Sequence, residues 1–175
     1  MEQQKPDGIL EHAPALRRYA RALTRDAGAA EDLVQETLLV AHERRSDLDP
    51  ERSIRGWLFS VLHNRFVDAA RRRRLEAARI ETMAETAIAP QPASPELSAY
   101  LQQIAERFDA LPDGQRAVLH LVAVEGLRYQ EAADLLKIPV GTVMSRLSRA
   151  RAALRQEGTE PGQSRLRVIG GRDDG

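Results

Sequence analysis

Apolar residues recur along residues 9–78 with the spacing of one helix face. The first stripe contains Leu16, Tyr19, Ala20 and Leu23, at positions i, i+3, i+4 and i+7. Similar stripes follow at residues 33–41 and 54–69, and the third has its buried side at Ile54, Leu58, Val61, Leu62 and Ala69. Residues 24–28 and the Asp49-Pro50 pair break the pattern. The three stripes and the two breaks together predict three helices, which form a first helical domain over residues 9–78.

The same periodicity returns after residue 95. It predicts one helix up to Phe108, a second around residues 118–122 that Gly126 ends, and two short helices at residues 129–136 and 142–155. The composition also favours helices over strands, because alanine, leucine and arginine dominate and aromatic residues make up only 4%. We therefore expect an all-α fold of two small helical domains, the second at residues 96–156.

Residues 79–95 differ from both helical segments. They contain Pro90, Pro92 and Pro95 and no sustained apolar period, which is typical of a flexible linker. Residues 157–175 hold five of the eleven glycines, so we expect a disordered tail there.

The wider composition narrows the possible chemistry. Hydrophobic residues make up 42% and charged residues 30%, which is typical of a folded protein. The chain has no cysteine, which excludes disulfides, thiolate zinc sites, iron–sulfur clusters and thiol nucleophiles. No apolar run is long enough to cross a bilayer, and the first ten residues lack a signal-peptide core. We expect a cytoplasmic protein without membrane insertion.

The net charge of zero hides a segregation of charge. The chain has 26 basic and 26 acidic residues, but Arg71–Arg74 form an uninterrupted basic run. Residues 135–156 contain five basic residues and no acidic one, whereas acidic residues gather at 26–36 and 43–51. Such a pattern suits a protein that contacts DNA on some faces and another protein on others. The alternative is that these charge runs are ordinary solvated helix faces.

The two short helices near the end suggest a helix-turn-helix. Pro139 and Gly141 separate them, and the second helix has a buried stripe. Its opposite face presents Ser145, Ser148, Arg149 and Ala152, and its flanks carry Arg146, Arg151 and Arg155. Small hydrogen-bonding groups flanked by arginines suit the DNA major groove. The alternative is an ordinary helical hairpin with a basic face.

The third helix carries a second group of polar residues. Trp57, Asn64 and Arg71 are spaced by seven, and Asp68 follows Asn64 by four, so all four share one face. A tryptophan aligned with an amide and arginines could stack on unpaired bases. Alternatively, Trp57 covers the helical core and Asp68 pairs with a neighbouring arginine; the spacing leaves both possibilities open.

Signals of catalysis are absent from the sequence. The four histidines are scattered without metal-binding spacing, and the chain has neither a phosphate-binding glycine loop nor a GxSxG elbow. We therefore expect no enzyme activity, no catalytic residues, no metal site and no cofactor.

Three stretches together resemble the extracytoplasmic-function sigma factors, bacterial RNA polymerase specificity subunits that keep only the second and fourth sigma domains. They are AEDLVQETLLVAHERR, RGWLFSVLHNRFVDAARRRR and LPDGQRAVLHLVAVEGLRYQEAADLLKIPVGTVMSRLSRARAALR. The resemblance covers about residues 9–156. It implies that residues 9–78 are sigma domain two, 79–95 the linker and 96–156 sigma domain four, followed by the tail at 157–175.

The resemblance also implies partners and roles. The partners are core RNA polymerase, through its β′ clamp helices and β subunit, promoter DNA, and an anti-sigma factor. The polymerase contacts would be Asp32, Gln35 and Glu36. The −10 element would be recognised and opened by Arg55, Trp57, Asn64, Asp68, Arg71 and Arg72. The −35 element would be read by Thr142, Ser145, Arg146, Ser148, Arg149 and Arg151.

Two departures from the family bear on these roles. Related chains often have an arginine and an aromatic residue where this one has Met144 and Ser148, so its −35 preference should not be inferred from theirs. Residues 50–54 also lack the aromatic residues that many members carry before the GW pair, so melting would depend more on the polymerase or on Trp57.

Two other functions compete with initiation by a sigma factor. The chain could be a sigma-like decoy or adaptor that binds an anti-sigma protein, or a free-standing helix-turn-helix repressor. The Arg71–Arg74 run and Arg149 favour the sigma factor, because a decoy has no use for DNA contacts. A repressor should carry an additional dimerisation helix, for which the sequence gives no sign.

The linker yields a testable prediction. Limited proteolysis of the free protein should cut first near residues 87–94, because this proline-rich stretch lacks an apolar face to bury. The fragments can be identified by mass spectrometry. Resistance of this stretch, with cleavage inside either helical segment instead, would show that the domain boundary is misplaced.

Overall fold

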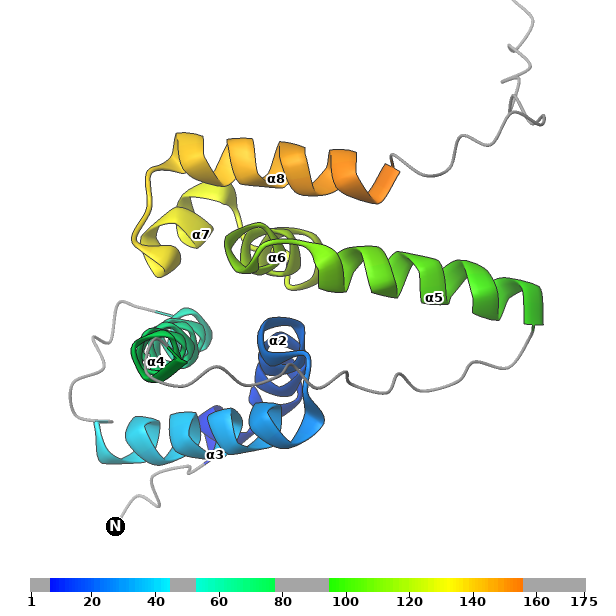
Figure 1. Cartoon of the computed structure of the whole chain (residues 1–175). Helices are drawn as coiled ribbons and strands as arrows, with labels where there is room; N and C mark the ends of the chain where they lie inside the picture. The colour runs from blue at the N-terminus through cyan, green and yellow to red at the C-terminus, as the bar shows by residue number, and fades with distance from the viewer. Residues whose placement is uncertain (1–6, 45–52, 78–94, 156–175) are drawn as a thin grey trace, which may run out of the picture.

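The computed structural model describes residues 7–44, 53–77 and 95–155, and every regular element in these ranges is helical (Figure 1). The elements are α1 (Asp7–Leu10), α2 (Ala13–Thr24), α3 (Ala27–Glu43), α4 (Ile54–Ala77), α5 (Pro95–Ala110), α6 (Asp113–Leu119), the π-helical turn η2 (His120–Val124), α7 (Tyr129–Leu136) and α8 (Val140–Arg155). The prediction of an all-α fold is confirmed. The predicted linker, apart from Pro95, and the predicted tail lie outside the described residues.

Local sequence signals explain the tight turn between α2 and α3. A proline in the first turn of α2 fits there, because that turn has no partner for its N–H. Arg25 then ends α2 in the left-handed conformation, with φ at 60°. Asp26 caps α3, because its Oδ1 accepts a hydrogen bond of 2.6 Å from the backbone N–H of Ala29. The break expected at residues 24–28 is thus a turn that holds α2 against α3.

The core of the first half comes from one face each of α2 and α3. The predicted stripe of α2 is buried, with Leu16, Tyr19 and Ala20 fully inaccessible. In α3 the buried residues include Val34, Thr37 and Ala41. Thr37 satisfies its buried hydroxyl by donating to the carbonyl oxygen of Leu33 at 2.6 Å. The period of the sequence therefore predicted the inner faces of these two helices correctly.

Helix α4 buries more than the one face predicted for it. Leu58 and Leu62 are buried as expected, but Ile54, Val61 and Ala69 are only half-buried. Phe59 and Phe66 are buried as well, on a side that lines grooves shared with the second half of the chain. The prediction was incomplete because α4 packs on one side against α2 and α3 and on the other against α7 of the second half.

The second half ends in the expected pair of short helices. Helix α6 runs directly into η2, which Gly126 ends with φ at 72°, as predicted. Helix α7 has the predicted bounds, and α8 begins at Val140, two residues earlier than expected. Lys137, with φ at 54°, ends α7 before Pro139. A buried core under α8 includes Val143 and Leu147.

The two halves pack against each other in the structure. In Figure 1, α6, α7 and α8 lie above α2, α3 and α4. Arg116 is completely buried at this junction, and its Nη2 donates to the Leu23 carbonyl oxygen at the end of α2, at 3.2 Å, and to Asp113 Oδ1 at 2.6 Å. Arg25 donates to the Asp109 carbonyl oxygen at 2.9 Å. The sequence predicted two helical domains joined by a flexible linker; in the structure the two halves contact each other, in part through polar groups at the ends of helices.

Tyr19 lies at the centre of this junction. Its ring is fully buried and its centroid lies 5.4 Å from that of Phe59 and 5.4 Å from that of His120. Its Oη lies 2.9 Å from His63 Nδ1, and the two groups share a hydrogen bond. Burial raises the pKa of the Tyr19 phenol, and burial together with the charge of Arg146 lowers the pKa of His63 to about 4. Both groups are therefore neutral near pH 7.

The buried histidine should make the fold sensitive to acid. The folded pKa of His63 lies below its ordinary value of 6.5, so the unfolded chain takes up a proton first as the pH falls. We expect the free energy of unfolding to fall between about pH 6.5 and about pH 4, by about 1–3 kcal/mol for this group. Burial also lowers the pKa of His120, which adds a loss in the same direction.

Chemical denaturation at a series of pH values measures this dependence. The His63→Gln variant should lose part of the acid sensitivity, because its amide takes up no proton. His42→Gln, at an exposed position on α3, is the control and should follow the wild-type profile. An acid limb as steep in His63→Gln as in the wild type would contradict the assignment.

Candidate nucleic-acid interface

The outer face of α8 is open to solvent. Val143, Leu147 and Ala150 are buried on its inner face. The exposed residues on this helix include Met144, Ser145, Ser148, Arg149 and Arg151. Ser145 Oγ donates to the carbonyl oxygen of Thr142 at 3.1 Å, and Thr142 is half-buried. Four of the six residues predicted for the −35 element thus lie exposed on one helix and can reach a partner.

Arg146 differs from its neighbours on α8. It is half-buried, and a Cβ built on Gly114 would lie 2.8 Å from its Nη1. The guanidinium therefore lies over α6, in space that only a glycine at position 114 leaves open. It also lines a groove with His63 and Arg71 of α4. The sequence placed Arg146 on a flank of the recognition helix; in the structure it points toward the first half.

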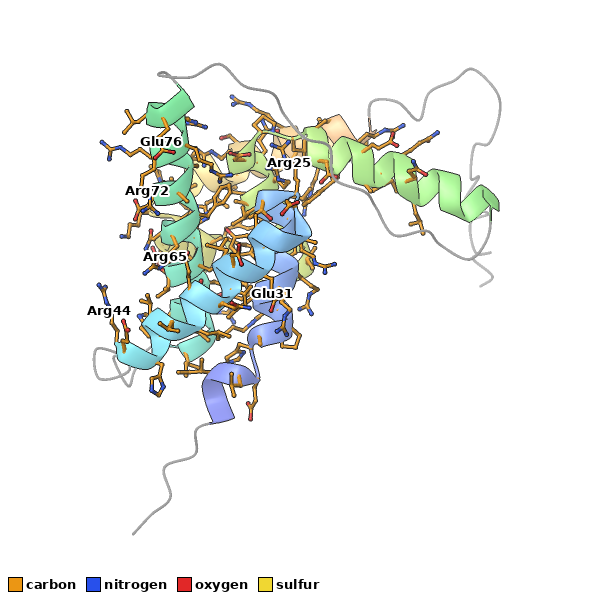
Figure 2. All side chains as sticks on the ribbon, turned by 60° about the horizontal axis from the view of Figure 1, so that its bottom comes forward. Arg25, Glu31, Arg44, Arg65, Arg72 and Glu76 are labelled. Carbon is orange, nitrogen blue, oxygen red and sulfur yellow. The ribbon has the colours of Figure 1, made fainter. Side chains whose placement is uncertain are left out.

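The polar residues predicted for the −10 element become more exposed toward the C-terminal end of α4. Trp57 is half-buried and packs against the core, and Asn64 is half-buried. Asp68, Arg71 and Arg72 are exposed. Figure 2 shows Arg65 and Arg72 along α4, with α3 in front. Trp57 therefore covers the core, which was one of the two possibilities left open by the sequence. The residues toward the C-terminal end of α4 are accessible.

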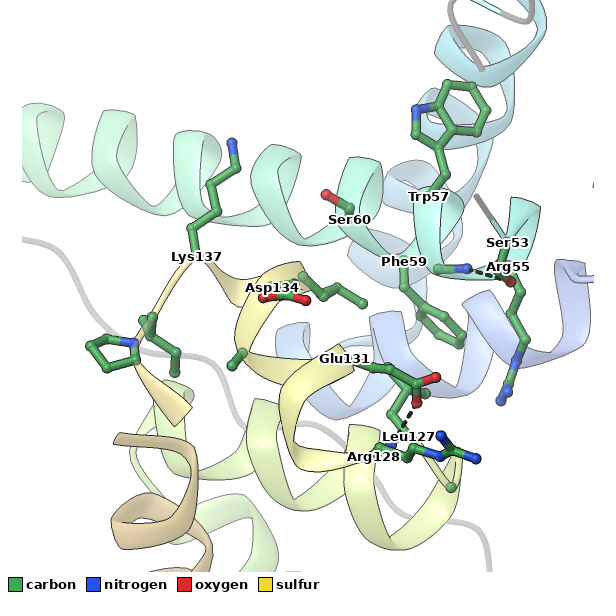
Figure 3. Close-up of a pocket in the computed structure, with 16 residues that line it drawn as sticks. Ser53, Arg55, Trp57, Phe59, Ser60, Leu127, Arg128, Glu131, Asp134 and Lys137 are labelled. Atoms are coloured by element: carbon green, nitrogen blue, oxygen red, sulfur yellow. Dashed lines mark hydrogen bonds between the residues drawn. The ribbon is translucent and has the colours of Figure 1, made fainter. Parts of the chain in front are cut away.

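Trp57 also lines a groove of about 1140 Å³ between α4 and α7. Figure 3 shows Phe59 and Arg55 pointing toward the side of Leu127 and Arg128, while Trp57 points away from Glu131 and Asp134. The opposite wall includes Lys137 and Pro139 from the turn of the helix-turn-helix. The groove thus joins a predicted −10 residue to the second half of the chain.

Arg55 is already bound within the protein. Its Nη2 donates to Glu125 Oε2 at 2.7 Å and to the Glu125 carbonyl oxygen at 2.8 Å. Its guanidinium carbon lies 5.4 Å from the ring centroid of Phe59. One residue predicted for the −10 element, Arg55, is therefore part of a contact between the two halves.

The predicted polymerase contacts share an exposed face of α3. Asp32, Gln35 and Glu36 are all exposed, on the side opposite the buried Val34. Glu36 Oε2 accepts a hydrogen bond of 3.1 Å from Arg65 on α4. Leu39 follows one turn later with 64% of its surface exposed, which adds an apolar side chain to this polar face. The arrangement suits a protein partner with both polar and apolar groups.

The sequence reasoning missed Glu125. Its side chain is 1% exposed, accepts hydrogen bonds from Arg18 and Arg55, and lies 3.2 Å from His120 Nε2. One sequence signal existed, because Glu125 is the only acidic residue in the stretch 117–127, where His120 is the only other polar side chain. An isolated carboxylate there predicts either a helix end or a buried ion pair, and only the structure identifies its partners.

Two further observations concern ligands and membranes. Among residues 7–44, 53–77 and 95–155, no three His, Asp or Glu side chains are grouped so that they could hold a metal ion. In the same ranges, none of the helices combines the length and apolarity that crossing a membrane requires.

Comparison with known proteins gives matches in both halves. Residues 9–63 match the family described as the Sigma2 domain of PhyR, and residues 101–154 match Sigma-70, region 4. The chain is 37% identical over 150 residues to the ECF RNA polymerase sigma factor EcfG of Rhodopseudomonas palustris, covering 85% of this chain and 81% of that protein. It is 38% identical over 159 residues to SigL of Mycobacterium tuberculosis, covering 89% of each.

A solved structure agrees with these relatives. The sigma factor RpoE from Bartonella quintana, determined in complex with the anti-sigma factor NepR, superposes with a TM-score of 0.73 and 31% identity. The match covers 85% of this chain and 92% of that one. Sequence similarity along most of the chain and similarity of fold thus lead to the same group, and the chain belongs to the extracytoplasmic-function (ECF) family of RNA polymerase sigma factors.

Proposed function

We propose that this sigma factor binds core RNA polymerase through α3 and recognises promoter DNA through α4 and α8. The observation that carries the proposal is the outer face of α8, where Ser145, Ser148 and Arg149 are exposed in a segment without acidic residues. The factor would act in the cytoplasm as a DNA-binding regulator, and RNA synthesis would remain with the polymerase. Run-off transcription with purified core polymerase and this protein tests the proposal.

The accessible half of α4 supports a role at the −10 element. Asp68, Arg71 and Arg72 are exposed, and Asn64 is within reach on the same face. Extruding a base from the duplex costs a few kcal/mol, which stacking and phosphate contacts must offset. Arginines can contact phosphates, and the partly exposed Trp57 can offer a stacking surface. Arg55 would join these residues only when it is free of Glu125.

An anti-sigma partner is part of the proposal. RpoE was solved in complex with NepR, and CnrH, 31% identical to this chain with a TM-score of 0.56, was solved in complex with the cytosolic domain of CnrY. A sigma factor whose DNA-binding and polymerase-binding faces are accessible needs control, and a protein that covers them would supply it. The second sigma domain would meet the polymerase at the β′ clamp helices, and the fourth would meet the β subunit.

One observation favours the decoy or adaptor as a second candidate. The family matched by residues 9–63 is the sigma-2 domain of PhyR, and PhyR from Bartonella quintana is described as an anti-anti-sigma factor. The solved PhyR structure is 19% identical to this chain and shares the fold alone. A decoy would bind an anti-sigma protein but fail in run-off transcription, so the same assay separates the two functions.

The first prediction of this proposal concerns polymerase binding. The double variant Asp32→Ala with Gln35→Ala should weaken co-purification with core polymerase, because it removes two polar groups from the exposed face of α3. Thermal unfolding should change by no more than about 0.5 kcal/mol, as for other exposed positions. The matched control is Gln103→Ala with Glu106→Ala, an exposed amide and carboxylate on α5. Undiminished co-purification of the α3 variant would rule out this face.

A second prediction separates base reading from phosphate binding on α8. Arg149 can offer paired donors to guanine O6 and N7, worth about 1–3 kcal/mol of discrimination, so Arg149→Ala should flatten preference at one or two −35 positions. Arg151→Ala should weaken all promoters alike and lower the salt slope by about one unit, because a flanking arginine contacts phosphate. Ser145→Ala should resemble a milder Arg149 change, since one hydroxyl contributes about 0.5–1.5 kcal/mol.

A panel of promoter variants, assayed with holoenzyme at several salt concentrations, measures these effects. Uniform and equal losses from Arg149→Ala and Arg151→Ala, with base preference intact, would show that the helix meets DNA with a different face.

A further inference from the structure

A buried carboxylate holds the two halves of the molecule together. Glu125, at the end of η2, is 1% exposed in its side chain. From α2 of the first half, Arg18 donates to Glu125 Oε1 at distances of 3.1 and 3.2 Å. From α4, Arg55 donates to Oε2 at 2.7 Å, and His120 Nε2 lies 3.2 Å from Oε1 within the second half. Three side chains thus surround one carboxylate, and two of them come from the other half.

These contacts account for the burial of the charge. A carboxylate in a protein interior is costly unless it is paired and hydrogen-bonded, and removal of one partner leaves part of its charge uncompensated. Separation of the halves would take both Arg18 and Arg55 from Glu125 and expose it to water. The ion pairs therefore form only when the halves are docked, so they stabilise the docked arrangement rather than either half by itself.

The docked arrangement conflicts with simultaneous contact to two promoter elements. Arg71 of α4 and Arg146 of α8, assigned by the proposed function to the −10 and −35 elements, line the same groove of about 460 Å³. The −10 and −35 elements are about 25 base pairs apart, which is roughly 85 Å along the duplex at about 3.4 Å per pair. The seventeen residues of the predicted linker can extend to about 60 Å. The halves must separate before both helices reach DNA.

We propose that Glu125 is an intramolecular latch that keeps this sigma factor closed by holding Arg18 and Arg55. Opening of the latch separates the halves and frees Arg55 for the −10 element, a consequence that rests on the proposed function. The closed form lowers the apparent affinity for promoters, because only the open fraction can bind both elements. This inhibition lies within the chain and acts beside that of the proposed anti-sigma partner.

Two neighbouring arginines on α2 offer a matched pair of variants. Arg18 reaches across to Glu125, whereas Arg17 pairs with Glu31 inside the first half at 3.0 Å. Both are solvent-exposed by about half, so neither alanine variant should disturb the core. Arg18→Ala removes one support of the latch, and Arg17→Ala removes a comparable ion pair that does not join the halves.

The distance between the halves is the direct measurement. Because the chain has no cysteine, Glu11→Cys and Ala153→Cys can carry two spin labels at exposed positions of the first and second halves. Pulsed electron paramagnetic resonance of the full chain should give a narrow distribution for the wild type and for Arg17→Ala. Arg18→Ala should raise the population at longer distances about three- to tenfold. Equal distributions in the two variants, or a wild type already as broad as Arg18→Ala, would overturn the latch.

Glu125→Gln provides an independent variant of the other partner. It keeps the size of the side chain and removes its charge, so it should also shift the distribution to longer distances, with helix content by circular dichroism unchanged. A distribution like that of the wild type in this variant would count against the latch.

Transcription then connects opening to activity. The concentration of sigma factor needed for half-maximal run-off should fall in Arg18→Ala by the factor by which the open population rises, and stay unchanged in Arg17→Ala. The distance measurement needs no polymerase, so the latch and the proposed function can be refuted independently of each other. A longer distance in Arg18→Ala with no transcription from any variant supports the latch and refutes the proposed function. Wild-type transcription with unchanged distances in Arg18→Ala refutes the latch alone.

Discussion

The burial of Tyr19 is the contact on which both halves of the molecule depend. Its ring lies against Phe59 of α4 and His120 of η2, and its hydroxyl shares a hydrogen bond with His63. A buried tyrosine contributes a large apolar surface, but its hydroxyl needs a polar partner. Helix α2 of the first half thus places one side chain against both α4 and η2, and His63 satisfies its hydroxyl. The hydrophobic core and the polar junction are thus parts of one arrangement.

The arginines of the described residues divide according to their surroundings. Several that lie between helices are paired with carboxylates, as Arg18 and Arg55 are with Glu125 and Arg65 is with Glu36. Arg149 and Arg151, in contrast, project from α8 in a segment without acidic residues. A formal charge of zero is therefore compatible with DNA binding, because part of the positive charge is paired between helices while Arg71 and Arg72 of α4 and Arg149 and Arg151 of α8 are exposed.

Sequence periodicity predicted those features that depend on a single helix and its neighbour. The inner faces of α2 and α3, the end at Gly126 and the bounds of α7 follow from local spacing and turn residues. The exposure of Asp32 and Arg149 follows in the same way, since each lies opposite a buried stripe. Their roles at the polymerase and the promoter stay predictions, as do the domain boundaries.

The rest depends on contacts between distant parts of the chain. Arg55 meets Glu125 across 70 residues and Arg18 meets it across 107, separations for which a single sequence carries no periodic signal. The second buried face of α4 went unpredicted for the same reason, because its partner α7 lies far along the chain. Arg146 points inward because Gly114 is close in space, which its own helix cannot indicate.

The π-helical turn η2 sets the register of this junction. In a regular α-helix, residues five apart point about 140° away from each other, at about 3.6 residues per turn. In η2 the Glu125 N–H donates to the His120 carbonyl oxygen at 3.0 Å, and the two side chains meet. If the same residues were wound as a regular α-helix, with none lost, Glu125 would turn away from His120 and from the side on which Arg18 and Arg55 reach it. The contact between the halves therefore depends on one wide turn of backbone as well as on the side chains that meet there.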